Sequence, residues 1–213
     1  DLMVANLGND ELFLVVNAAC KDQDLAHLRQ HLGEQCQIEP LFEERALLAL
    51  QGPQAGAVLA RLAPGSEKLV FMTGGALSIG GIPVFATRSG YTGEDGFEIS
   101  VAAVDADRLA RLLLAQPEVM PIGLGARNSL RLEAGLCLYG SDIDTTTTPV
   151  EAALTWAIQK VRRTGGERAG GFPGAHKVLA QLDGGTGARA RKRLFVVALE
   201  RVHVLYCSLL QPP

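Results

Sequence analysis

The sequence predicts an α+β fold in which antiparallel sheets carry flanking helices. Short apolar runs typical of strands alternate with amphipathic stretches typical of helices. The connections between successive strands are too short for the long crossovers that parallel strands require. Turn signals separate neighbouring strands, notably Gly8-Asn9-Asp10 and Gly80-Gly81. Such turns join antiparallel strands into hairpins.

The first half of the chain is predicted to contain two hairpins and three helices. In the first helix, leucines recur on one stripe and Gly33 supplies the stop signal. Pro53 suits the start of the second helix, because its ring presets the backbone angle. The predicted elements are strands 2–7 and 11–17, a helix over 22–32, strands 35–42 and 46–51, a helix over 52–62, a hairpin over 77–89, a strand over 97–101 and a helix over 105–115.

The second half is predicted to contain three helices joined by polar loops. Its best-marked helix start is a capping box, in which Thr148 and Glu151 satisfy each other's backbone N–H groups around Pro149. The predicted elements are a helix over 125–135, a polar loop over 141–147, a helix over 148–160, a loop over 162–171, a short helix over 174–181, a linker over 183–193 and a strand over 194–199.

The composition argues against several functional classes. The chain has 20 Lys and Arg against 23 Asp and Glu, a net charge of −3, whereas a nucleic-acid-binding protein presents a broad basic face. Its cysteines, Cys20, Cys36, Cys137 and Cys207, include no CxxC pair, so we expect no metal site. No apolar run reaches the roughly 18 residues that cross a bilayer. We therefore expect neither a nucleic-acid nor a membrane partner.

Two patterns admit more than one interpretation. The glycine-rich residues 90–96 could suggest a nucleotide loop, but their spacing differs from the dinucleotide fingerprint and they run into a strand. A tight turn between strands is the better interpretation. Arg127 and Arg131 stand at i and i+4 on one predicted helix. They could make ordinary ion pairs, or bind a carboxylate, for which the planar guanidinium is suited.

Three stretches together resemble one enzyme family. They are Gly90-Tyr-Thr-Gly-Glu-Asp-Gly-Phe-Glu-Ile-Ser100, then Gly123-Leu-Gly-Ala-Arg-Asn-Ser-Leu-Arg-Leu-Glu-Ala-Gly135, then Leu138-Tyr-Gly-Ser-Asp-Ile-Asp144 with Thr148-Pro-Val-Glu-Ala152. In this order and spacing they are similar to the aminomethyltransferases, the T-proteins of the glycine cleavage system. The resemblance covers residues 1–199 approximately.

The resemblance implies a tetrahydrofolate-dependent transferase of the mitochondrial matrix. Family members accept an aminomethyl group from the lipoyl arm of H-protein, release ammonia and pass the methylene to tetrahydrofolate. Their fold is a three-domain cloverleaf with the folate in a central cavity. The expected partners are therefore lipoylated H-protein and a small-molecule folate, with tetrahydrofolate as co-substrate.

The resemblance also implies a set of site residues. Asp1 matches the family's critical carboxylate, which would hold the pterin and raise the nucleophilicity of the attacking nitrogen by orientation and charge. A carboxylate such as Glu98 suits bidentate pairing with an amino-pyrimidine edge. The folate-contacting positions implied by the match are Asn17, Tyr91, Glu98, Arg127 and Trp156.

The same match predicts how the chain divides. Residues 1–34 and 126–185 would be parts of the first folate-binding domain, and 35–125 a middle α+β domain. Residues 186–213 would start the C-terminal barrel region, diverging from the family after about 200. The family pattern extends beyond both ends of this sequence, so we expect a partial cloverleaf without the barrel, inactive on its own.

Two alternatives stay open from the sequence. One is the folate-binding half of a dimethylglycine or sarcosine dehydrogenase, which shares this fold. The other is a folate-binding fragment without catalytic activity. The residues of the first and third stretches, Tyr91-Thr-Gly-Glu-Asp-Gly96 and Leu138-Tyr-Gly-Ser-Asp-Ile-Asp144, favour the aminomethyltransferase over the dehydrogenase.

Overall fold

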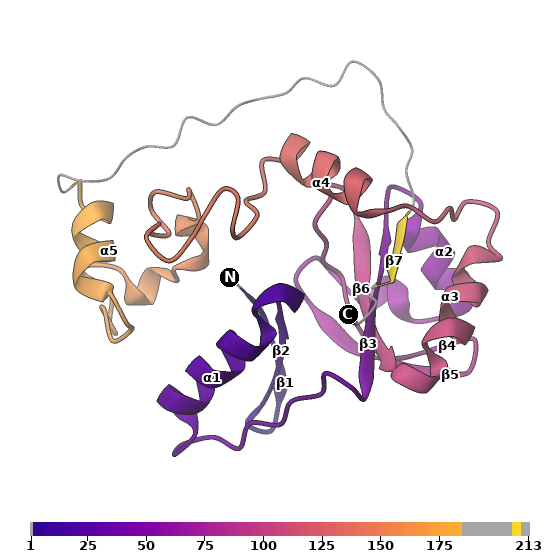
Figure 1. Cartoon of the computed structure of the whole chain (residues 1–213), viewed down its shortest axis with the longest axis horizontal. Helices are drawn as coiled ribbons and strands as arrows, with labels where there is room; N and C mark the ends of the chain where they lie inside the picture. Colours follow the sequence, from indigo (N-terminus) through magenta and orange to yellow (C-terminus); the bar gives the residue numbers. More distant parts are fainter. Residues whose placement is uncertain (1, 185–205, 210–213) are drawn as a thin grey trace. The chain divides into compact units, whose positions relative to one another are not determined.

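The computed structural model describes residues 2–184 and 206–209, and it confirms the α+β fold with antiparallel sheets (Figure 1). The chain forms two compact units, which divide after Ala134. The first unit holds residues up to Ala134 together with 206–209, and the second holds 135–184. The division into four parts stated above stays a prediction.

The first unit opens with the expected hairpin. Strands β1 (Leu2–Gly8) and β2 (Glu11–Val16) pair antiparallel. Both turn residues are left-handed, with φ of 51° at Asn9 and 62° at Asp10. That is the backbone of a type I′ turn, in which asparagine and aspartate are tolerated. A short 3-10 turn, η1 (Ala18–Cys20), leads into helix α1 (Lys21–Leu32), as predicted.

A five-stranded antiparallel sheet forms the centre of the first unit. Its spatial order is β4-β5-β6-β3-β7. The predicted hairpin turn at Gly80 and Gly81 is confirmed, since both residues have positive φ. The elements are β3 (Arg45–Gln51), α2 (Ala55–Leu62), η2 (Ser66–Lys68), β4 (Gly74–Ile79), β5 (Ile82–Thr87), β6 (Gly96–Ala102), η3 (Ala103–Asp105), α3 (Ala106–Leu114), α4 (Leu124–Glu133) and β7 (Tyr206–Leu209).

One face of the sheet is packed against α2 and α3. The alternate residues Phe97, Ile99 and Val101 of β6 are fully buried on this face. They meet Leu59 of α2 and Leu109 of α3 in a single hydrophobic cluster. Because side chains alternate across a strand, the residues between them lie on the other face.

The opposite face of the sheet carries polar residues. Glu98 lies there, directly across from Thr87 of β5 and Ala49 of β3. Arg45 donates hydrogen bonds from Nε to the Ser100 hydroxyl, 2.7 Å, and from Nη2 to the Ser100 carbonyl, 2.8 Å. The helix-covered face therefore supplies the core, while this face presents chemistry-bearing groups.

Two predicted elements are wrong. Residues 35–42 form turns and coil instead of a strand. The N–H groups of Gln35 and Cys36 bond back to the Leu32 carbonyl, which continues the end of α1. Pro40 also lacks the N–H that a strand would use for its ladder.

The second correction concerns the predicted helix over 148–160. The capping box is present, with Thr148 N–H donating to Glu151 Oε2 at 2.8 Å and Glu151 N–H to Thr148 Oγ1 at 3.2 Å. The helix nevertheless stops after one turn. Ala153 has φ of 59°, and Leu154 N–H bonds to the Pro149 carbonyl. This is a Schellman ending, which satisfies the last carbonyls and turns the chain away.

The rest of the second unit is built from short turns. It contains η4 (Thr155–Ala157), η5 (Lys160–Arg162) and α5 (Ala175–Leu182), the last of which confirms the predicted short helix. The Thr148 hydroxyl donates to Gln181 Oε1 of α5 at 2.7 Å, so the capping box is tied to that helix. The strand predicted over 194–199 lies outside the described residues.

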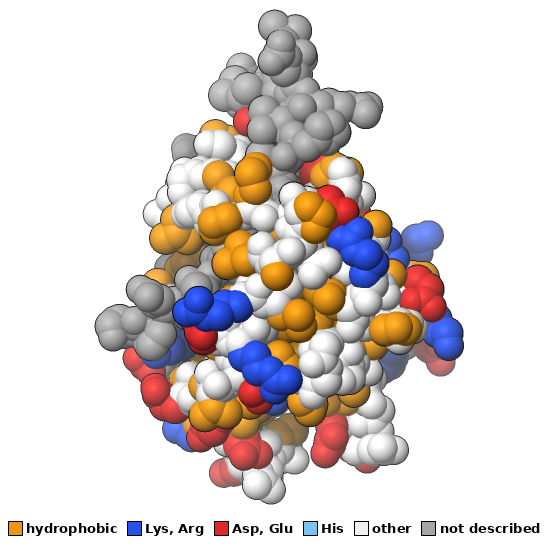
Figure 2. All heavy atoms as spheres, turned by 90° about the vertical axis from the view of Figure 1, so that its right-hand side faces the viewer, with side chains coloured by type: hydrophobic (Ala, Val, Ile, Leu, Met, Phe, Trp, Pro, Cys, Tyr) orange, Lys and Arg blue, Asp and Glu red, His pale blue; other side chains and the backbone are white. Residues whose placement is uncertain are grey.

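The surface carries both charge signs. On the face shown in Figure 2, Lys and Arg side chains lie beside Asp and Glu side chains, with small hydrophobic patches between them. That face shows no broad basic area of the kind that nucleic-acid binding uses. Across the described residues, no helix combines the length and the apolarity needed to cross a membrane.

Neighbouring leucines on α3 test the location of the core. Leu113 is fully buried in the cluster, whereas Leu114 is 38% exposed. We expect Leu113→Ala to lower the free energy of unfolding by about 2–5 kcal/mol, because it leaves a cavity. Leu114→Ala should cost less than about 1 kcal/mol. Urea unfolding of both variants measures the difference, and equal losses would contradict this packing.

Candidate functional site

The loop between β5 and β6 is organised around the buried amide of Gln51. This side chain is 1% exposed and lies at the end of β3. Its Nε2 donates to the Ser89 carbonyl at 3.0 Å and to the Phe97 carbonyl at 3.3 Å. Its Oε1 accepts a hydrogen bond from Thr92 Oγ1 at 3.1 Å. The Gln51 amide therefore bonds to the start of the loop at Ser89, to its middle at Thr92 and to the strand that follows it at Phe97.

Two glycines make room for this amide. A Cβ built on Gly90 would lie 1.7 Å from Gln51 Oε1, and one on Gly96 would lie 2.5 Å from Gln51 Nε2. A side chain at Gly90 would require the amide to move, and one at Gly96 would also lie 2.6 Å from the Leu50 carbonyl oxygen. The glycines of residues 90–96 thus serve a close approach between the loop and Gln51, and the segment leads into β6, as expected for a tight turn between strands.

An ion pair closes the loop on its outer side. Arg88 donates from Nε to Asp95 Oδ1 at 2.9 Å and from Nη2 to Asp95 Oδ2 at 2.7 Å. This bidentate contact holds the pKa of Asp95 below its ordinary value, chiefly through the hydrogen bond from the guanidinium. Gly52 N–H also bonds to the Asp95 carbonyl at 2.8 Å, which joins the loop to the end of β3.

The structure brings two of the predicted site residues together. The guanidinium carbon of Arg127 lies 4.8 Å from the centroid of the Tyr91 ring, a cation–π contact. Tyr91 comes from the loop and Arg127 from the first half of α4. Gly93 allows this approach, because a Cβ there would lie 2.7 Å from the Ala134 methyl. The two residues place a guanidinium cation over an aromatic ring.

Glu98 is half-buried on β6, and its carboxylate is held from one side. Ser89 Oγ donates to Glu98 Oε2 at 2.8 Å. Sequence reasoning singled out Glu98 but missed Ser89 and Gln51. A polar residue ending the otherwise apolar run of β3 was the available signal for Gln51, and Ser89 gave none.

The other predicted site residues have separate positions. Asn17 directly follows β2 and is half-buried at the start of η1. Trp156 belongs to the second unit, in η4, and is 68% exposed. Asp1 lies outside the described residues. Arg131, unlike Arg127, is buried and donates from Nε to Asn128 Oδ1 at 2.9 Å, a contact within its own helix.

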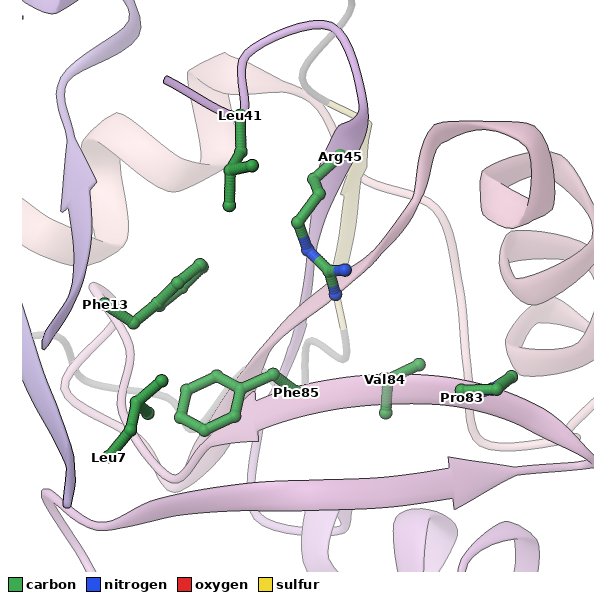
Figure 3. Close-up of a pocket in the computed structure, with 7 residues that line it drawn as sticks. All are labelled: Leu7, Phe13, Leu41, Arg45, Pro83, Val84 and Phe85. Atoms are coloured by element: carbon green, nitrogen blue, oxygen red, sulfur yellow. The ribbon is translucent and has the colours of Figure 1, made fainter. Parts of the chain in front are cut away.

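A separate shallow cavity lies between the hairpin and the sheet of the first unit. Its lining is apolar apart from Arg45, and Phe13 and Phe85 meet across it with ring centroids 5.2 Å apart (Figure 3). None of the five predicted site residues that lie within the described part of the chain lines it. Within the described part of the chain, no three His, Cys, Asp or Glu side chains gather in a way that could hold a metal ion.

Comparisons with known proteins point in one direction. A family model described as the GCVT N-terminal domain matches residues 1–162. A mitochondrial aminomethyltransferase of Solanum tuberosum is 50% identical over 198 residues, covering 89% of this chain and 48% of the relative. That of Canis lupus familiaris is 50% identical over 192 residues, covering 86% of this chain and 46% of the relative.

A solved structure agrees with the sequence relatives. The glycine cleavage system aminomethyltransferase T of Bartonella henselae matches with a TM-score of 0.74 and 47% identity, over 87% of this chain and 49% of that one. The chain therefore spans about half the length of the relatives that it matches.

Matched glycine variants test the close approach of Gly90 to the Gln51 amide. We expect Gly90→Ala to lower the free energy of unfolding by about 2 kcal/mol or more, because the new methyl must displace a buried, hydrogen-bonded amide. Gly75→Ala is the control, since a Cβ there meets only Leu69 Cδ2 at an ordinary 3.7 Å. Thermal unfolding compares the two variants. A Gly90→Ala variant that is as stable as the unmodified chain would contradict the close approach of Gly90 to Gln51.

The ion pair predicts a pH dependence. A carboxyl whose pKa is lower in the folded state stabilises the fold above its unfolded pKa, about 3.9 for aspartate, and this contribution is lost as the pH falls through the lower folded value. Asp95→Asn should therefore be less stable than the unmodified chain at neutral pH. Below about pH 4 the difference in unfolding free energy between the two proteins should become smaller.

Urea unfolding across this pH range measures the stability difference between the unmodified chain and Asp95→Asn. In an Arg88→Gln background, the effect of Asp95→Asn should no longer depend on pH in this way, because the partner that lowers the pKa of Asp95 is gone. A stability difference that stays constant down to the lowest pH would contradict the assignment of the ion pair.

Proposed function

The chain belongs to the GCVT N-terminal domain family, and from this membership we propose that it is part of a mitochondrial aminomethyltransferase of the glycine cleavage system. The observation that carries the proposal is identity of 47–50% to aminomethyltransferases over 86–89% of the chain. Such identity over so much of the chain supports a shared site as well as a shared fold.

The proposed reaction moves one carbon between two carriers. The aminomethyl group starts on a lipoyl sulfur of H-protein. Its C–N bond breaks to release ammonia, its C–S bond breaks to return the dihydrolipoyl thiol, and its carbon bonds to two nitrogens of tetrahydrofolate. The product is 5,10-methylenetetrahydrofolate. No electrons are gained or lost overall, so no redox cofactor is required.

The geometry of the first unit suits a folate. Glu98 presents a carboxylate, which can pair with the amino-pyrimidine edge of a pterin through two hydrogen bonds. The stacked Arg127 and Tyr91 offer a cation and an aromatic face, which suit a planar ring and a carboxylate tail. In this proposal Asn17 and Trp156 contact the folate as well, and Asp1 orients the pterin and its attacking nitrogen.

The relatives support the aminomethyltransferase over the dehydrogenase alternative. The matched proteins carry aminomethyltransferase names from a plant, a mammal and a bacterium. Assaying the chain with tetrahydrofolate and aminomethyl-loaded H-protein distinguishes a catalytic unit from a folate-binding fragment. Turnover would mean that the chain suffices for the reaction, and binding without turnover would leave it the folate-binding role.

Tetrahydrofolate binding by calorimetry tests the proposal. We expect the chain to bind, and Glu98→Ala and Arg127→Ala each to weaken binding about tenfold or more, because each removes a charged hydrogen-bonding partner. The matched controls are Glu43→Ala, an exposed glutamate, and Arg108→Ala, an exposed arginine on α3. Both controls should change the affinity less than about twofold.

Two results would contradict the proposal. A folded chain that does not bind tetrahydrofolate would remove the folate site from these residues. Binding that neither Glu98→Ala nor Arg127→Ala weakens would place the ligand elsewhere on the chain. Far-ultraviolet circular dichroism of each variant confirms that a loss of binding is not a loss of folding.

A further inference from the structure

Behind Glu98 lies a short relay of hydroxyl groups. Ser89 is 4% exposed, and its Oγ donates to Glu98 Oε2 at 2.8 Å. Thr87 Oγ1 lies 2.8 Å from the same Ser89 Oγ. A serine hydroxyl has one proton to donate. Since that proton goes to the carboxylate, Ser89 Oγ accepts from Thr87 Oγ1, which also lies 3.5 Å from the Glu98 carbonyl oxygen, and the relay runs from Thr87 through Ser89 to Glu98.

The relay is anchored at its centre. Gln51 Nε2 donates to the Ser89 carbonyl at 3.0 Å, so the backbone of Ser89 cannot shift without breaking a buried hydrogen bond. Thr87 and Glu98 are directly opposite each other on neighbouring strands. The hydroxyl of Ser89 is thereby held at one position relative to the Glu98 carboxylate.

We propose that Ser89 is a positioning residue that orients the Glu98 carboxylate for its ligand. This inference rests on the proposed folate function. Within the described part of the chain, Ser89 is the one side chain that donates to this carboxylate, and it uses Oε2. The terminal torsion of glutamate is otherwise broad. The hydrogen bond to Oε2 restricts this torsion, and with it the plane in which the carboxylate meets the ligand.

The orientation matters because the contact is bidentate. Two parallel hydrogen bonds from an amino-pyrimidine edge need a carboxylate that is coplanar with the ring. A carboxylate already held in that plane loses less rotational freedom when the ligand binds. Ser89 therefore contributes to affinity through Glu98, without touching the ligand itself.

A double-mutant cycle on the full chain tests this coupling, with tetrahydrofolate as the probe. We expect Ser89→Ala to weaken binding on the order of fivefold to tenfold. In a Glu98→Ala background the same change should have less than about a twofold effect, because its only route to the ligand is gone. The control is Ser78→Ala, an exposed serine of β4, which should change nothing in either background.

The proposal would be overturned if Ser89→Ala and Glu98→Ala lowered the affinity for tetrahydrofolate independently of each other. A merely structural serine weakens binding by the same factor with and without Glu98, so multiplying effects in the double variant contradict the positioning role. Unchanged binding in Ser89→Ala contradicts it as well.

A second measurement needs no ligand. Side-chain ¹³C relaxation should show an ordered Glu98 carboxyl in the unmodified chain and a mobile one in Ser89→Ala, while the exposed Glu94 stays mobile in both. Equal order at Glu98 in the two proteins would overturn the proposal. If the unmodified chain fails to bind tetrahydrofolate, the proposed function fails, and this relaxation measurement still decides the role of Ser89.

Discussion

The buried amide of Gln51 is the constraint on which the candidate site depends. A buried amide must be hydrogen-bonded, because leaving its donors or acceptor unpaired costs about 1–3 kcal/mol. Gln51 meets that requirement only if the loop after β5 brings the Ser89 carbonyl and the Thr92 hydroxyl to it, and β6 the Phe97 carbonyl. The same arrangement sets Tyr91 beside Arg127 and Ser89 beside Glu98. Satisfying one polar side chain therefore organises the whole loop.

The two faces of the central sheet divide stability from function. The face covered by α2 and α3 buries a continuous apolar cluster, which holds the strands in register. Because register is specified by that buried face, the opposite face can carry Glu98 and Thr87 at fixed positions with little packing of their own. The chemistry-bearing residues thus depend on the core without belonging to it.

Local signals allowed much of the fold to be predicted. Asn9 and Asp10 marked a turn through residues that tolerate left-handed φ, and Gly80-Gly81 did the same. The prediction of a helix over 148–160 was wrong about its length. The capping box marks its start in the sequence, but nothing in the sequence marks the left-handed Ala153 that ends it. The hydrogen bonds of Gln51 were not predicted for a different reason. The bond to Ser89 joins residues 38 positions apart, and only the folded sheet brings them together. The Glu98 and Arg127 assignments came from family resemblance, and spacing alone left Arg127 undecided.

¹⁵N NMR on the intact chain can map which residues tetrahydrofolate contacts. Added tetrahydrofolate should shift the amide signals of Tyr91, Glu98 and Arg127, with smaller shifts along the loop that Gln51 holds. Signals of the helix-covered core, such as Leu113, should stay in place. Shifts confined to the cavity beside Arg45 and Phe85, or no shifts in a folded chain, would contradict the assignment of the folate site to this loop.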